Sequence, residues 1–375
     1  MFDADETCAE FRQALLSTRT RRELIVALGK TAAGSALLGS FASIMPTRAQ
    51  AQPQPVTVFV FGGAWRRALV EAGGNPFTQQ TGIPVRYQEP YTWAKLRAMH
   101  EAKAQQIDCA SVQGTEVILA HRMNMTTPLD WRLIDRSNLD ARQLSKPNAI
   151  GCYSLSMVVC YNKKTWPTEN HPKSWADFWD VTKFPGRRAL RRDATWTIEA
   201  ALLADGVKES EFYPLDVERG FKSLDRIKPH VKAWWKDNSQ AQALIEQQEV
   251  DLIAAMDGRA SDTIVSNAAP FEIVWHQQIS SAGGQGWIVP VGCPNPEGAM
   301  KFLNVVARPE TWAVFARLLY YAPLNPKAYD FIYPELAKRL SSYPENETTA
   351  HTVNYEWWAD NLAVVQRRFE RWLQT

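Results

Sequence analysis

Residues 56–88 read VTVFVFGGAWRRALVEAGGNPFTQQTGIPVRYQ, and this stretch decides the fold class. The apolar run at 56–61 predicts a strand that ends at a pair of glycines. A helix is expected over 65–80, and a Thr-Gly pair that stops it leads into a second strand over 83–88. This order of strand, helix and strand is typical of an α/β protein with mostly parallel strands.

The same alternation continues outward from this unit. A helix expected over 93–105 is followed by a strand over 107–112, and Gln113 comes directly after that strand. Ligands of open α/β sheets bind at the carboxyl ends of strands. Gly62, Gly63 and Gln113 are therefore candidate ligand contacts.

A second series of strands and helices begins after the apolar run 153–161 and predicts a second lobe. In this half, a short strand over 188–192 leads into Asp193. The other strands expected here cover 231–235, 250–256, 273–276 and 287–291.

No low-complexity linker separates the two lobes, so strand crossings at about 156–161 and 284–290 are expected to join them. The predicted division assigns residues 54–156 and about 288–325 to lobe 1, and residues 157–287 and about 326–375 to lobe 2.

The first 51 residues are interpreted as an export signal. Arg21 and Arg22 precede an apolar stretch that glycines interrupt, and the small-residue site Ala49-Gln50-Ala51 predicts cleavage after Ala51. The Thr-Arg-Arg-x-Leu start resembles the twin-arginine signal. An ordinary secretory leader and an uncleaved anchor are the alternatives.

Composition and motifs argue against several function classes. The net charge of the 375 residues is +2 at pH 7, so neither nucleic acid nor anionic membrane is an expected partner. The sequence contains no HExxH, GxSxG or GxxxxGK motif and no strand-linked GxGxxG motif, so no enzyme activity, cofactor or metal is expected. The cysteines beyond the leader match no metal or redox spacing and are expected to be mostly buried thiols: Cys109, Cys152, Cys160 and Cys293.

Seven segments, in order along the chain, carry a family resemblance. They are FVFGGAW (59–65), FTQQTGIPV (77–85), VVCYNKKTWP (158–167), PKSWADFWDVTKFPGRRAL (172–190), EQQEVDLIAAMDGRA (246–260), IVPVGCPNPEGAMKFLNVV (288–306) and YYAPLNPKA (320–328). The chain resembles the extracellular solute-binding proteins of ABC transporters, in the branch of the spermidine/putrescine receptors. The resemblance implies a bilobal periplasmic-binding-protein fold, with two α/β lobes joined by crossing strands, a ligand cleft between them and closure around the ligand.

The resemblance also implies the role and the partners. A receptor of this kind is a periplasmic monomer without catalytic activity, which delivers a small molecule to ABC permease subunits in the inner membrane. An enzyme exported by the twin-arginine route, or a sensory receptor of the same fold, is the alternative.

Polyamine receptors of this family pack rings along the methylene chain of the ligand and pair carboxylates with its ammonium ends. Trp65 stands at a ring position and Asp193 at a carboxylate position, whereas Trp196 and Gln285 replace two acids. These losses disfavour a long diamine, since an unpaired buried ammonium costs several kcal/mol. We expect a small amino-carboxylate, such as a γ-aminobutyrate-like amino acid, with Asp193 meeting the amine and Arg259 the carboxylate. An amine or polyamine is the alternative solute.

Further candidates come from loops that face the ligand in this family. They are Gly63, Gln113, Glu116, Asn238, Ser239, Asp257 and Gln285. Arg191 and Arg192 could each bind a carboxylate, but they are expected on a solvated face. Tyr320 and Tyr321 are expected in a packing segment.

Overall fold

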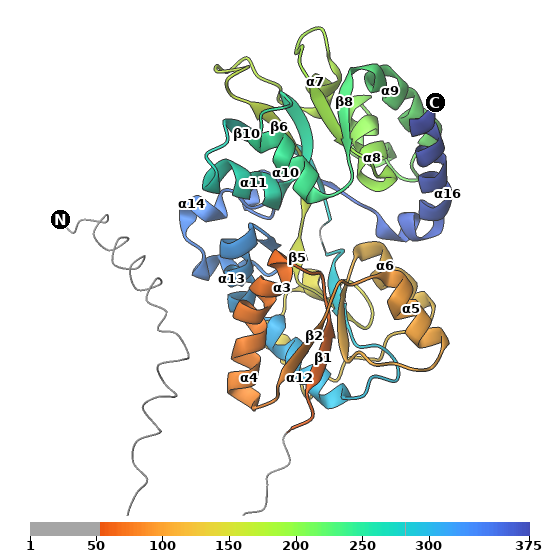
Figure 1. Ribbon diagram of the computed structural model, residues 1–375, viewed down its shortest axis with the longest axis vertical. Coiled ribbons are helices and arrows are strands. Elements are labelled where there is room, and N and C mark those ends of the chain that lie inside the picture. The colour runs from red at the N-terminus through yellow and green to blue at the C-terminus, as the bar shows by residue number, and fades with distance from the viewer. Residues whose placement is uncertain (1–52, 282) are drawn as a thin grey trace, which may run out of the picture. The chain divides into compact units, whose positions relative to one another are not determined.

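The computed structural model describes residues 53–281 and 283–375, which form two large sheets with helices packed around each and one two-stranded sheet (Figure 1). The predicted leader and its cleavage site lie outside the described residues. We call the first sheet and its helices lobe 1, and the second sheet and its helices lobe 2. The alternation of strands and helices confirms the α/β class.

The sheet of lobe 1 has five strands in the order β2-β1-β3-β11-β4. Their bounds are β1 Val56–Phe59, β2 Val85–Gln88, β3 Cys109–Val112, β4 Ala149–Gly151 and β11 Gly286–Ile288. β1 pairs in parallel with β2 and β3, whereas β11 returns from the second half of the chain and pairs antiparallel with β3 and β4. The prediction of mostly parallel strands is therefore wrong for the β3-β11-β4 part of the sheet, because β11 runs antiparallel to both of its neighbours.

Helices cover both faces of this sheet (Figure 1). On one face lie α3 (Ala64–Leu69), α4 (Asn75–Thr81), α12 (Pro296–Val306) and α13 (Pro309–Leu319), and on the other α5 (Trp93–Glu101) and α6 (Gly114–Arg122). A π-helical segment, Val70–Gly74, joins α3 to α4 where one continuous helix was expected. Its glycines allow close packing, since a Cβ on Gly73 would lie 2.8 Å from Val306 and one on Gly74 would lie 1.7 Å from Tyr87.

The sheet of lobe 2 has six strands in the order β13-β10-β6-β9-β7-β8. Their bounds are β6 Ser156–Asn162, β7 Arg188–Arg191, β8 Val231–Trp235, β9 Leu252–Met256, β10 Phe271–Ser280 and β13 His351–Thr352. β7 pairs in parallel with β8 and β9, and β6 pairs antiparallel with β9 and β10. This sheet is also mixed.

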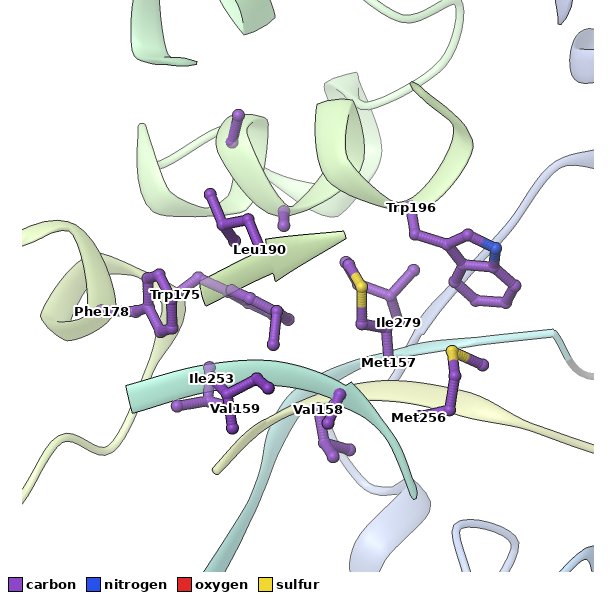
Figure 2. Close-up of a cluster of buried hydrophobic side chains, with 14 of the residues drawn as sticks. Met157, Val158, Val159, Trp175, Phe178, Leu190, Trp196, Ile253, Met256 and Ile279 are labelled. Atoms are coloured by element: carbon purple, nitrogen blue, oxygen red, sulfur yellow. The ribbon is translucent and has the colours of Figure 1, made fainter. Parts of the chain in front are cut away.

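The core of lobe 2 lies between its sheet and the surrounding helices. The helices are α7 Trp175–Trp179, α8 Ala194–Ala204, α9 Val217–Ile227, α10 Asn238–Glu246, α11 Asp257–Ser266 and α16 Tyr355–Gln374. Ser174 caps α7 by accepting from the N–H of Asp177. Figure 2 shows Trp175 and Phe178 at one end of the buried cluster and Trp196 and Met256 at the other. That second end faces the pocket described below.

Three segments of the chain connect the lobes. The chain enters lobe 2 from β5 (Tyr153–Ser154) into β6, and it returns between β10 and β11. A third connection runs from β12 (Ala322–Pro323), which pairs with β5, to β13. Smaller elements along the chain are α14 Pro334–Ala337, α15 Pro344–Glu347 and the 3-10 turns Arg136–Asn138, Ala141–Leu144, Glu209–Glu211, Lys228–His230 and Pro326–Phe331.

Two further features complete the fold. Cys109, Cys152 and Cys160 are buried free thiols, as predicted, and Cys293 is a half-buried free thiol. Among the residues that the structure describes, no helix has the length and apolarity to cross a membrane.

Candidate functional site

A pocket of about 260 Å³ lies between the lobes. Its lining residues are Phe61, Gly62, Trp65, Gln113, Tyr153, Leu155, Arg191, Trp196, Asn238, Met256, Arg259, Gln285 and Tyr321. A larger hollow, of about 590 Å³, is lined by lobe 1 alone, and its charged residues Asp130, Arg132 and Glu297 pair with protein side chains. The pocket between the lobes is therefore the better candidate for a binding site.

Strand ends bring these residues together, because the carboxyl ends of parallel strands meet at one edge of a sheet. In lobe 1, Trp65 follows β1 and Gln113 follows β3. In lobe 2, Arg191 ends β7, while Asn238 and Arg259 lie in the first turns of the helices that follow β8 and β9. The predicted site residues that line the pocket are Trp65, Gln113, Trp196, Asn238, Arg259 and Gln285.

Two guanidinium groups, both from lobe 2, line the pocket. Arg259 makes no side-chain hydrogen bond or ion pair with another described residue. The Nε of Arg191 is buried without a hydrogen-bond partner among the described residues, and its Nη2 lies 3.9 Å from a carboxylate oxygen of Asp193. No acidic residue is among the described lining residues. The pocket thus offers donors and positive charge to an anionic group.

The expectation that Arg191 lies on a solvated face is wrong. Its side chain is 22% exposed and its guanidinium lies 5.2 Å from the centre of the Trp235 ring. The neighbouring Arg192 instead pairs with Glu370 of α16 at 2.7 Å. Successive side chains of an extended segment point to opposite sides, which separates the two arginines.

Aromatic rings form the opposite wall of the pocket. The Trp65 ring lies 5.9 Å from that of Trp287 and 5.5 Å from that of Phe315, so it is also part of the lobe 1 core. Tyr153 stacks on Tyr321 at 5.1 Å. Such faces can pack on a carbon chain or attract a cation.

Two predicted acids serve as helix caps and do not line the pocket. Asp193 accepts from the N–H of Thr195 at 2.9 Å and caps α8. Glu116 accepts from the N–H of Gln113 at 2.9 Å and from the Tyr91 hydroxyl at 2.8 Å. Burial raises the pKa of the Glu116 carboxyl.

Three other predicted residues also lie outside the lining. Asp257 is buried and accepts from the N–H of Ser156 at 2.9 Å, and burial raises its pKa to about 6. The N–H of Ser239 donates to the side chain of Asp237 at the start of α10. Gly63 precedes α3 with a φ of +65°, a conformation that favours glycine.

Sequence reasoning did not select several lining residues: Phe61, Tyr153, Leu155, Met256 and Tyr321. The strand-end rule selected Gly62 and Gln113, which line the pocket, and it also covers Phe61. Tyr153 and Tyr321 lack such a signal, because the pairing of β5 with β12 joins segments far apart in the sequence.

Comparison with known proteins agrees with this architecture. The family described as bacterial extracellular solute-binding protein matches residues 74–348. The γ-aminobutyric acid-binding protein of Pseudomonas aeruginosa is 32% identical, over 89% of this chain and 95% of that protein. The spermidine/putrescine-binding periplasmic protein of Escherichia coli is 27% identical, over 76% of this chain and 82% of that protein.

A solved structure supports the bilobal fold. The ABC transporter substrate-binding protein from Bradyrhizobium japonicum is 32% identical and superimposes with a TM-score of 0.78, over 85% of this chain and 99% of that protein. The chain belongs to the bacterial extracellular solute-binding proteins and is a substrate-binding protein of an ABC transporter.

Proposed function

We propose that this protein captures a small solute with a carboxylate group, such as a γ-aminobutyrate-like amino acid, in the periplasm and delivers it to an ABC importer. Arg191 and Arg259, two guanidinium groups in one pocket without an acidic lining residue, carry the proposal. A bidentate bond to a carboxylate would use their open donors.

The amine of such a ligand has weaker partners in the pocket. The rings of Trp65 and Trp196 can attract an ammonium group, and the side-chain oxygen of Gln285 has no hydrogen bond. Asp193, the expected amine partner, lies beside Arg191 and outside the lining. We therefore propose that the carboxylate is held more tightly than the amine.

A polyamine fits this pocket less well. Each ammonium end would be buried without a carboxylate among the lining residues, at a cost of several kcal/mol. The relative named for γ-aminobutyric acid also matches more of this chain, at higher identity, than the relative named for spermidine and putrescine. Export by the twin-arginine route and a monomeric state belong to the same proposal.

Isothermal titration of the purified protein tests the substrate class. Titrants are γ-aminobutyrate, a panel of other amino acids, putrescine and spermidine. We expect an amino-carboxylate to bind with a Kd near 1 μM, which corresponds to about 8 kcal/mol, and the polyamines to give no binding heat. Tight binding of putrescine or spermidine, with no binding of any carboxylate, would overturn the proposal.

A further inference from the structure

Helix α16 belongs to the core of lobe 2 but also reaches lobe 1. Its side chains Tyr355, Trp358, Val365 and Phe369 are buried in the lobe 2 cluster. The first turns of α16 contact α6 of lobe 1, which lies just below that end of the helix in Figure 1. The helix therefore bridges the two lobes.

One guanidinium group makes the polar part of this contact. Arg122 is the last residue of α6. Its Nη1 donates to Asp360 at 2.5 Å and its Nη2 donates to Glu356 at 2.7 Å. The two acids are four residues apart on one face of α16, so a single arginine binds both. These ion pairs join a helix of lobe 1 to a helix of lobe 2.

An apolar contact lies beside the ion pairs. Ile118 of α6 is 3% exposed and is buried in the cluster of lobe 2. The Tyr355 ring lies against two glycines, because a Cβ on Gly114 would come within 2.6 Å of it and one on Gly284 within 2.2 Å. Lobe 1, lobe 2 and the return connection thus meet at one ring.

This contact adjoins the pocket. Gln113, which lines the pocket, directly precedes Gly114. The buried hydroxyl of Tyr355 faces the side chains of Ser281 and Gln285, without a hydrogen bond of good geometry, and Gln285 also lines the pocket. A change in the contact between α16 and α6 would therefore alter the surroundings of two residues that line the pocket, Gln113 and Gln285.

We propose that Arg122, Tyr355, Glu356 and Asp360 form an inter-lobe clasp, which holds the lobes together over the pocket and raises ligand affinity without touching the ligand. A contact present only when the lobes adjoin raises the fraction of molecules in the binding-competent state, and the apparent Kd is inversely proportional to that fraction. These are positioning residues. Because the ion pairs are exposed, salt screens them and their effect is modest.

Small-angle X-ray scattering of the ligand-free protein tests the clasp directly. Arg122→Glu places like charges in contact, and we expect a larger radius of gyration than in the wild type at low salt. The triple variant Arg122→Glu, Glu356→Arg and Asp360→Arg restores opposite charges and should restore the wild-type curve. Identical scattering from the wild type and Arg122→Glu overturns the proposal.

Arg97→Glu is the matched control. Arg97 pairs with Glu101 at 3.1 Å within one helix of lobe 1, and its exposure is similar to that of Arg122. The same reversal of charge at Arg97 should leave the scattering unchanged. An equal expansion in both variants would mean that net charge, and not the contact between α6 and α16, separates the lobes, which also overturns the proposal.

Titration with γ-aminobutyrate measures the effect on affinity, and only this part rests on the proposed function. We expect Arg122→Gln to weaken binding about two- to fivefold at low salt, with the difference vanishing near about 1 M salt. Equal affinities at low salt overturn the role of the clasp in binding. If the wild type does not bind γ-aminobutyrate, the substrate proposal fails for this compound, while the scattering result still decides whether the clasp exists.

Discussion

The two lobes present different chemistry to the same pocket. The lobe 1 wall consists largely of rings, and Trp65 already packs against Trp287 and Phe315 of its own lobe. The lobe 2 wall carries Arg191 and Arg259, which have weak protein partners or none among the described residues. The lobe 1 wall is thus stabilised by contacts within the protein, whereas the charge on the lobe 2 wall remains available to a ligand.

The largest expected effect tests the structural role of the lobe 1 wall. Trp65 is 4% exposed, so Trp65→Ala should lower the free energy of unfolding by about 3–5 kcal/mol. Arg259→Met, on the lobe 2 wall, should change it by less than about 0.5 kcal/mol, because the Arg259 side chain makes no hydrogen bond or ion pair with another described residue. Urea denaturation measures both. Equal destabilisation by the two substitutions would contradict the contrast between the walls.

Lobe 2 should also show a marked pH dependence through Glu199 of α8. Its buried carboxyl accepts hydrogen bonds from the Tyr213 hydroxyl and, at 2.9 Å, from the Trp358 indole. Burial raises the pKa of Glu199 to about 8. Since the folded-state pKa exceeds the usual value of 4.5, the stability that the neutral acid provides is complete below pH 4.5 and is lost as the pH rises through 8.

Denaturation curves between pH 5 and 9 measure this loss. The free energy of unfolding of the wild type should fall by about 2–4 kcal/mol over that range. Glu199→Gln keeps the shape of the side chain but cannot ionise, so its stability should vary less with pH. Parallel curves for the wild type and the variant would show that Glu199 ionises as freely as an exposed acid.

The role of the lobe 2 wall in binding is tested by Arg259→Met. Loss of a charged hydrogen-bonding partner should weaken binding of a carboxylate ligand about 10- to 100-fold. Arg259→Lys keeps the positive charge but not the forked geometry of the guanidinium group. Its affinity for the ligand should therefore lie between those of the wild type and Arg259→Met. Isothermal titration gives the affinities, with Arg97→Met as the control. Unchanged affinity in Arg259→Met would assign the carboxylate to another group.

The smallest expected effect is on ligand affinity and comes from substitutions at two neighbouring residues of α10. Asn238 lines the pocket and Ser239 does not. Asn238→Ala should weaken binding about three- to tenfold, since one hydrogen bond is lost, while Ser239→Ala should change affinity by less than about twofold. The same titrations measure both variants. A larger loss at Ser239 would place the ligand on the other side of the helix.

Local patterns predicted much of the fold. The strand over 231–235 is found with both predicted ends, because a short apolar run between polar segments is a local signal. The antiparallel entry of β11 between β3 and β4 could not be predicted in this way, since it depends on pairing between distant segments. For the same reason β10, at Phe271–Ser280, is longer than the expected 273–276.

The residues of the site could also be predicted only in part from local sequence. The strand-end rule found Gln113 and Arg259, and the family resemblance pointed to Trp65. Asp193 was expected to meet the amine, yet it caps α8, and Arg191, two positions earlier, lines the pocket. Sequence position alone did not decide which of these side chains faces the pocket, because the choice depends on the pairing of β7 and on the capping of the next helix.

The free thiols carry a consequence for where this protein can fold. No described cysteine is bridged to another, and burial raises the pKa of Cys293 to about 11, which keeps its sulfur in the unreactive thiol form. The described fold needs no oxidant, so it can form in a reducing cytoplasm as readily as in an oxidising compartment. Completion of folding before export, as a twin-arginine route would require, is compatible with its redox chemistry.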